Sequence, residues 1–214
     1  MPEITQIKPL RSAKDRVGVH LDGRYYASYQ AETLIRAGLA VGSQVDEETL
    51  DALARADEPA AAYERSLGYL QARARSAREM ETYLKGKGYA PETVAATVQR
   101  LRGNGLLDDE AFGGMLLRER KRQGGYGRAM VKQQLKGKGL ESELVDQLLQ
   151  EDFSEEEELA SAAAYARKMQ RRYADREDRQ RQQAVSQALA RRGYSWSVIR
   201  EALARLGEEM DFDD

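Results

Sequence analysis

The chain has 214 residues, of which 33% are charged and 41% hydrophobic, with one tryptophan and no cysteine. The lack of cysteine excludes disulfides and thiolate metal sites, and the abundant Ala, Leu, Arg, Glu and Gln are all good helix formers. No apolar run approaches the roughly 20 residues that a membrane span needs, and the first residues lack the pattern of a signal peptide, so we expect a helix-rich cytoplasmic protein that does not contact a membrane.

The formal net charge of −2 hides strongly segregated blocks. Residues 117–138 hold eight basic residues and one acid, whereas residues 141–158 hold nine acids and no base. Residues 159–207 hold eleven Lys or Arg against four acids. Such segregation suits a polyanion or a protein with a matching charge pattern, although solvated helix faces would also produce it.

Residues 1–30 predict a small β-hairpin element. Apolar and polar residues alternate from Val17 to Leu21 and again from Tyr25 to Tyr29. Asp22-Gly23 joins the two runs, and this dipeptide suits the type I′ turn, which needs positive φ at both positions. Ile4 to Leu10 is a candidate third strand. Because a lone hairpin is only marginally stable, we expect it to pack on helices.

His20 is the only histidine, and it lies within this hairpin. Its position on the strand places it on the face opposite Val17 and Val19. No further metal-ligating residues accompany it, so we expect a surface residue and no metal.

Residues 31–58 predict a helical connector. A short helix should end at Gly38, and Asp46 suits the N-cap of a second helix that runs through Ala56. Pro59 is favoured in the first turn of a helix. We therefore expect one helix to end before Pro59 and another to begin there.

The rest of the chain contains one phrase three times. Its key residues are Leu84, Gly88 and Val94, then Leu135, Gly139 and Val145 after 51 residues, then Leu189, Gly193 and Ile199 after a further 54. Self-similarity at a near-constant period predicts an array of one supersecondary unit. We expect a mainly α protein with tandem three-helix repeats in an elongated array, at 59–106, 107–153 and 154–207, followed by an acidic tail at 208–214.

A glycine stands at the same position of the phrase in each repeat. We expect Gly88, Gly139 and Gly193 to be structural, in the left-handed conformation that follows a helix C-terminus. Apolar residues at helical spacing predict the buried faces, which in the last helix include Trp196 and Ile199.

Asp108, Asp109 and Glu110 form the nearest approach to a catalytic acidic cluster. They directly precede the helix that carries Phe112. Asp108 as N-cap, with Asp109 in the first turn near the positive helix end, explains them without chemistry. No His or Cys stands nearby in the sequence to complete a nucleophile or metal site, so we expect neither catalytic residues nor a cofactor.

The segment Gly124-Gly125-Tyr126-Gly127 lies between two basic helices. One interpretation is a turn whose amides cradle a phosphate at a helix N-terminus. The other is a plain interhelix turn. The segment matches neither the P-loop nor the dinucleotide-binding motif, so we favour the turn.

Two ridges of basic residues are the best candidates for binding. Their members stand three or four residues apart, which places them on one face of a helix. The residues are Arg118, Lys121 and Arg122 on the first helix and Arg128, Lys132 and Lys136 on the second. Such groups suit phosphates or a partner's carboxylates. No aromatic residues are interleaved with them, which argues against base stacking and sequence readout.

Several of these motifs together resemble the RecX family of regulatory proteins. They are Ser76-Ala-Arg-Glu-Met, Lys85-Gly-Lys-Gly88, Gly105-Leu-Leu-Asp-Asp-Glu-Ala-Phe112, the basic run from Arg118, Gly127-Arg-Ala-Met-Val-Lys132 and Leu135-Lys-Gly-Lys-Gly139. The resemblance runs from about Tyr63 to Leu149 and more loosely to Leu206.

The resemblance implies a modulator of the RecA recombinase, built from tandem three-helix repeats and without catalytic residues. Such proteins bind along the groove of the RecA–DNA filament and restrain its ATP hydrolysis, strand exchange and coprotease activity. By motif match, the six ridge residues are the expected contacts with the filament or with single- or double-stranded DNA. We expect a monomer.

Two features depart from the family pattern. The third repeat has Phe153-Ser-Glu-Glu in place of the Leu-Leu-Asp-Asp cap, and residues 1–58 receive no function from the resemblance. The alternative hypothesis is a DNA-binding protein without sequence specificity that competes with RecA for the strand.

Overall fold

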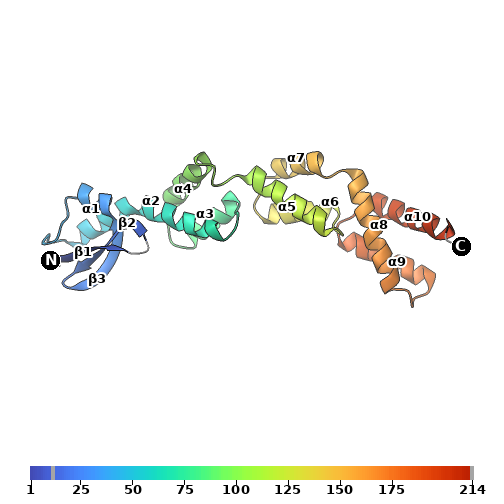
Figure 1. The fold of residues 1–214 in the computed structure, drawn as a ribbon, viewed down its shortest axis with the longest axis horizontal. Coiled ribbons are helices and arrows are strands. Elements are labelled where there is room, and N and C mark those ends of the chain that lie inside the picture. Colours follow the sequence, from blue (N-terminus) through green and yellow to red (C-terminus); the bar gives the residue numbers. More distant parts are fainter. Residues whose placement is uncertain (11–12, 213–214) are drawn as a thin grey trace. The chain divides into compact units, whose positions relative to one another are not determined.

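The computed structural model describes residues 1–10 and 13–212, which form two compact units. The first unit comprises residues 1–74 and 80–107, and the second comprises residues 75–79 and the chain from Asp108 onward. Figure 1 shows strands at the N-terminal end of the chain and helices elsewhere. None of the helices in the described ranges has the length and apolar character that crossing a membrane requires.

The first unit begins with a three-stranded antiparallel sheet in the order β1-β2-β3. The strands are β1 (Ile4–Leu10), β2 (Ala13–Leu21) and β3 (Arg24–Gln30). Asp22 and Gly23 form the turn between β2 and β3 with φ of 47° and 82°, so the predicted hairpin with its two positive φ angles is confirmed. The candidate third strand is confirmed as β1.

One face of the sheet packs on two helices, α1 (Ala31–Arg36) and α2 (Glu47–Ala72). The buried cluster joins all three strands to both helices and the loop between them. Its fully buried members are Ile4, Val19, Tyr29, Leu34, Val45 and Leu53. The hairpin is therefore stabilised by helical packing, as its small size requires.

The prediction that one helix ends before Pro59 and another begins there is wrong. α2 is a single helix of 26 residues, with Asp46 as its N-cap and Pro59 in its interior. The buried positions Leu53, Asp57 and Ala62 lie on both sides of the proline, whose own side chain is exposed. Tertiary contacts on both sides of Pro59 thus offset the lost backbone hydrogen bond.

Three helices follow the pattern of the first repeat. The second half of α2 is joined by α3 (Ala77–Lys85) and α4 (Pro91–Gly103). Within the first unit the rings of Tyr69 and Tyr83 stack with centroids 3.9 Å apart, which fixes α2 against α3.

The second unit holds two further three-helix repeats, each with its own core. The second repeat contains α5 (Asp109–Gln123), α6 (Arg128–Gly137) and α7 (Ser142–Asp152). The third contains α8 (Glu155–Arg172), α9 (Asp178–Arg191) and α10 (Trp196–Phe212). The expectation of a mainly α fold with tandem three-helix repeats is confirmed. α10 includes most of the predicted acidic tail, while residues 213–214 lie outside the described residues.

The glycines of the repeated phrase have two structural roles. Gly88, Gly139 and Gly193 have φ of 85°, 83° and 83°, so their predicted left-handed conformation is confirmed. A Cβ atom at Gly139 would lie 2.3 Å from the Cβ of Arg78, and one at Gly193 would lie 2.4 Å from the amide nitrogen of Met130. At Gly88 nothing lies within 4 Å. The second and third glycines therefore also allow a neighbouring helix start to pack closely.

We predict opposite effects of Gly→Ala substitution two residues apart. Gly139→Ala should destabilise the second unit by more than about 2 kcal/mol, because the strain of the left-handed conformation adds to the clash with Arg78. Gly137→Ala should stabilise it by about 0.5–1 kcal/mol, since Gly137 is helical with open space beside it. Urea denaturation followed by circular dichroism measures both, and equal effects would contradict this account.

Candidate functional site

The two aspartates of the acidic cluster before Phe112 are helix caps. Asp108 is the N-cap of α5, as predicted, and accepts a hydrogen bond from the Ala111 amide at 2.9 Å. Asp109 accepts one from the amide of Ala77, the first residue of α3, at 2.8 Å. The sequence did not indicate this second cap, because it joins residues 32 positions apart. Capping thus accounts for both aspartates without invoking catalysis.

His20 is half-buried, and its ring lies edge-on to Tyr25 with centroids 5.7 Å apart. Among residues 1–10 and 13–212, no group of three His, Cys, Asp or Glu side chains lies close enough to hold a metal ion.

The glycine segment before α6 uses its amides internally. The amides of Gly124, Gly125 and Gly127 donate to the Arg120 carbonyl at 3.0 Å, the Ser161 hydroxyl at 2.9 Å and the Arg192 carbonyl at 2.9 Å, respectively. Amides with such partners do not form a phosphate cradle. The structure therefore favours the interhelix turn.

Three of the six predicted binding cations are engaged inside the second unit. Lys121 donates to the Asp152 carbonyl at 2.7 Å and forms an ion pair with Glu157 at 2.8 Å. Lys132 forms an ion pair with Asp146, which holds the pKa of that carboxyl below its usual range. The acids that follow α6 in the sequence thus neutralise part of the predicted ridges.

Arg128 is the most firmly held of the three. Its guanidinium donates to the carbonyl oxygens of Leu149 and Phe153, at and beyond the end of α7. Its Nε lies 3.8 Å from the buried Glu158 carboxylate, which also accepts from the Arg128 amide at 2.7 Å. These contacts satisfy carbonyls that a helix end leaves without intrahelical partners. Arg128 is therefore part of the fold.

The other three predicted cations are available to a partner. Arg118, Arg122 and Lys136 are exposed, and no carboxylate of the described chain lies within ion-pair distance of them. The Arg118 side chain folds back over Gly114 on its own helix, where a Cβ atom would lie 3.2 Å from its guanidinium. Each predicted ridge therefore contributes only part of its charge to the surface.

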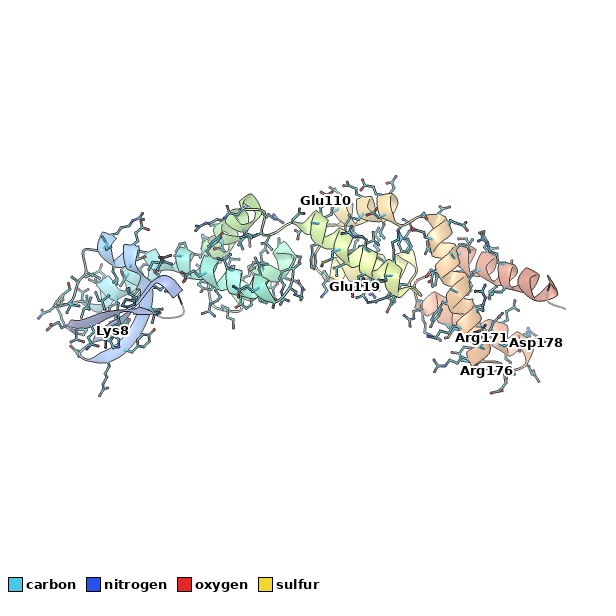
Figure 2. The ribbon with its side chains drawn as sticks, viewed as in Figure 1. Lys8, Glu110, Glu119, Arg171, Arg176 and Asp178 are labelled. Atoms are coloured by element: carbon cyan, nitrogen blue, oxygen red, sulfur yellow. The ribbon has the colours of Figure 1, made fainter. Side chains whose placement is uncertain are left out.

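The third repeat adds exposed cations that the predicted site did not include. Lys168, Arg171 and Arg172 occupy the last turns of α8. Figure 2 shows Arg171 and Arg176 where α8 ends and the chain continues towards α9. The charge count of residues 159–207 was the available signal, but it did not separate exposed cations from paired ones.

Trp196 was expected in the core and is exposed. Its side chain at the start of α10 is 65% accessible, whereas Ile199 is buried. The helical spacing was right for Ile199, but Trp196 is in the first turn of the helix, at the edge of the buried face.

We predict that neutralising the two kinds of arginine has different effects on stability. Arg128→Gln should destabilise the second unit by about 2 kcal/mol or more, because it leaves helix-end carbonyls and the buried Glu158 without their charged partner. Arg122→Gln removes the same charge at an exposed position and should change stability by less than about 0.5 kcal/mol. Thermal or urea unfolding of the two variants provides the measurement. Similar losses in both would show that Arg128 is not structural.

Comparison with known proteins matches each of the three repeats to a domain of the same family. Three family models match, described as the first, second and third three-helix domains of RecX, at residues 62–101, 108–149 and 155–203. These ranges contain all six predicted binding cations.

Curated relatives match nearly the whole chain, which spans about three quarters to four fifths of their own length. The chain is 33% identical to the regulatory protein RecX of Limosilactobacillus reuteri, over 92% of this chain and 74% of that protein. It is 32% identical to that of Levilactobacillus brevis, over 100% of this chain and 80% of that protein. A crystal structure of regulatory protein RecX aligns with a TM-score of 0.71 and 32% identity, covering 94% of this chain and 98% of that one. RecX from Lactobacillus salivarius shares the fold, with a TM-score of 0.67 over 71% of this chain and 98% of that one. The chain therefore belongs to the RecX family of regulatory proteins.

Proposed function

We propose that this protein regulates the RecA recombinase by binding to the RecA–DNA filament, and that it catalyses no reaction of its own. Membership of the RecX family supports this proposal, since relatives at 32–33% identity are named regulatory proteins. In this proposal the bound protein restrains ATP hydrolysis, strand exchange and coprotease activity. The protein acts as a monomer without a cofactor, and its own affinity for DNA is weak and independent of sequence.

The observation that carries the proposal is the charge left after internal pairing. Arg118, Arg122 and Lys136 on α5 and α6 are exposed and have no carboxylate within ion-pair distance in the described part of the chain, although Asp146 is close enough for Lys136 to lower its pKa. The neighbouring helices α7 and α8 begin with acidic residues. A surface that alternates in sign suits a filament that presents both protein and phosphate groups.

A non-enzymatic role also fits the acidic residues. Asp108 and Asp109 are occupied as helix caps, and Glu158 is buried against Arg128. These carboxylates are positioned by structural partners and do not converge on a shared substrate position.

The alternative function is a DNA-binding protein that competes with RecA for the strand. The unpaired cations favour it as well, because phosphate contacts dominate DNA affinity. The two functions differ in stoichiometry. Inhibition of the DNA-dependent ATPase of RecA, at protein concentrations far below those that coat the DNA, supports action on the filament. Inhibition only near saturation of the DNA, and relieved by more DNA, supports competition.

We predict that removing the three unpaired cations together weakens binding to the filament. The triple variant Arg118→Gln, Arg122→Gln and Lys136→Gln should bind preformed RecA–DNA filaments at least about tenfold more weakly, since each lost charge–charge contact costs a few tenths to one kcal/mol. Co-sedimentation with filaments at fixed salt measures the affinity, and circular dichroism should show unchanged helix content.

The control for this prediction changes the same charge in the first unit. The variant Lys8→Gln, Arg24→Gln and Arg55→Gln removes three exposed cations of the sheet and α2 that also have no carboxylate within ion-pair distance. Its filament binding should stay within about twofold of the original protein. If both variants lose affinity equally, net charge controls binding and the α5–α6 surface does not.

A further inference from the structure

Within the second unit, a cavity lies where the second and third repeats meet. It measures about 670 Å³, between the end of α5, the glycine turn and one face of α8. Its floor includes the small side chains Ala160 and Ala164. Four basic side chains line it, namely Arg120, Lys121, Lys168 and Arg192, together with Tyr126 and Tyr165.

The charge of this cavity is not neutralised from within. Glu157 is its one acidic lining residue, and it is paired with Lys121 at 2.8 Å. The hydrogen bond from Lys121 lowers the pKa of Glu157, so the carboxyl stays ionised and its charge remains committed to that lysine. Arg120, Lys168 and Arg192 have no carboxylate within ion-pair distance in the described chain. Three cations therefore remain to bind an anion.

Arg192 is positioned by contacts on both repeats. Its guanidinium carbon lies 4.8 Å from the centre of the Tyr126 ring and 5.0 Å from that of Tyr165. Its carbonyl oxygen accepts from the Gly127 amide at 2.9 Å. Gly125 lies against Tyr165, since a Cβ atom there would be 3.1 Å from the ring. A guanidinium held in this way loses little conformational entropy when it binds an anion.

Lys138, in the second repeat, occupies the position that corresponds to Arg192 and shows that packing of the following glycine does not require an unpaired cation. Lys138 precedes Gly139 as Arg192 precedes Gly193, and both glycines pack on the start of a helix. The ammonium of Lys138 lies 3.5 Å from the Glu79 carboxylate. The side chain of Arg192 contacts two tyrosine rings, whereas that of Lys138 contacts a carboxylate. The cavity therefore keeps a charge that the same architecture neutralises elsewhere.

We infer that this cavity is a binding site for the phosphodiester backbone of a nucleic-acid strand. The inference rests on the proposed function in that it names the ligand of part of the same charged surface. Exposed cations continue beyond the cavity, because Arg171 and Arg172 lie about one helical turn past Lys168 on α8. A polymer with regularly spaced anions meets these cations in turn. The two alanines carry no hydrogen-bonding groups, and the lining side chains Gln123 and Ser161 already bond within the chain, so we expect binding that is independent of sequence.

Fluorescence anisotropy of a labelled oligothymidine, without RecA, tests the site directly. Lys168→Gln should reduce the slope of log affinity against log salt by about 0.7, which is about a fivefold loss at 0.1 M salt. Arg200→Gln removes the same charge from an exposed position outside the cavity and should change affinity by less than about twofold. Equal losses in the two variants would overturn the inference.

A second pair of variants adds a charge instead of removing one. Ala164→Glu places a carboxylate on the cavity floor, whereas Ala204→Glu places one on an exposed part of α10. Both alanines are exposed, so both variants should fold, with unchanged circular dichroism. We expect at least about a fivefold loss of oligothymidine affinity for Ala164→Glu and less than about a twofold loss for Ala204→Glu. Equal affinities would contradict the site.

A competitor distinguishes nucleic acid from an acidic protein segment. Polyglutamate, at the same concentration of negative charge, should displace the oligothymidine poorly. If polyglutamate displaces the oligothymidine equally well from the original protein, but no longer does so from Ala164→Glu, the cavity binds carboxylates and the inference fails. The RecA ATPase assay separates this outcome from the proposed function. If Lys168→Gln weakens DNA binding as expected, but the original protein has no effect on the RecA ATPase, the site stands and the filament proposal is refuted.

Discussion

The fold depends on one type of hydrogen bond that occurs three times. In each case the main-chain amide at the N-terminus of a helix donates to a carboxylate on the first helix of a repeat. The three pairs are Gln30 with Asp57 at 2.7 Å, Ala77 with Asp109 at 2.8 Å, and Arg128 with Glu158 at 2.7 Å. The first amides of a helix have no intrahelical partner, and in each pair the carboxylate satisfies one of them at a partly buried position. Each repeat has a small core of its own, so these bonds fix neighbouring elements in register.

Asp57 and Glu158 are almost fully buried, at 3% and 5% exposure, and each has an arginine beside it. A buried carboxylate that loses its partner costs more free energy than the pair contributes, so Arg16 and Arg128 are committed to the fold.

The features that sequence predicted well are those set by neighbouring residues. Asp22-Gly23 specifies its turn through the backbone alone, and the glycines of the repeated phrase, Gly88, Gly139 and Gly193, are needed for a left-handed φ. The repeat period was visible because similar residues perform the same local task in each copy. By contrast, the continuity of α2 through Pro59 depends on tertiary packing on both sides of the proline.

The candidate site was only partly predictable for the same reason. Helical spacing placed Arg128 and Lys132 on a ridge with Lys136, but spacing carries no information about partners on other helices. Arg128 is held by α7 and Glu158, and Lys132 by Asp146, at separations of 14 to 30 residues along the chain. Asp109 likewise caps a helix 32 residues earlier. Only the three-dimensional structure separates cations that hold the fold from cations that remain for a partner.

The charge counted in the sequence blocks is therefore larger than the charge that the folded protein offers to a partner. The acidic block at 141–158 neutralises part of the preceding basic block, through Asp146, Glu157 and Glu158, and Glu156 pairs with Arg205 of the third repeat. Phosphate affinity rises steeply with the number of cations that a protein contributes. A chain that used all of its cations would bind any nucleic acid tightly and without discrimination. Internal pairing limits the available charge to defined positions, which favours a partner that offers several weak contacts along its length, as a filament does.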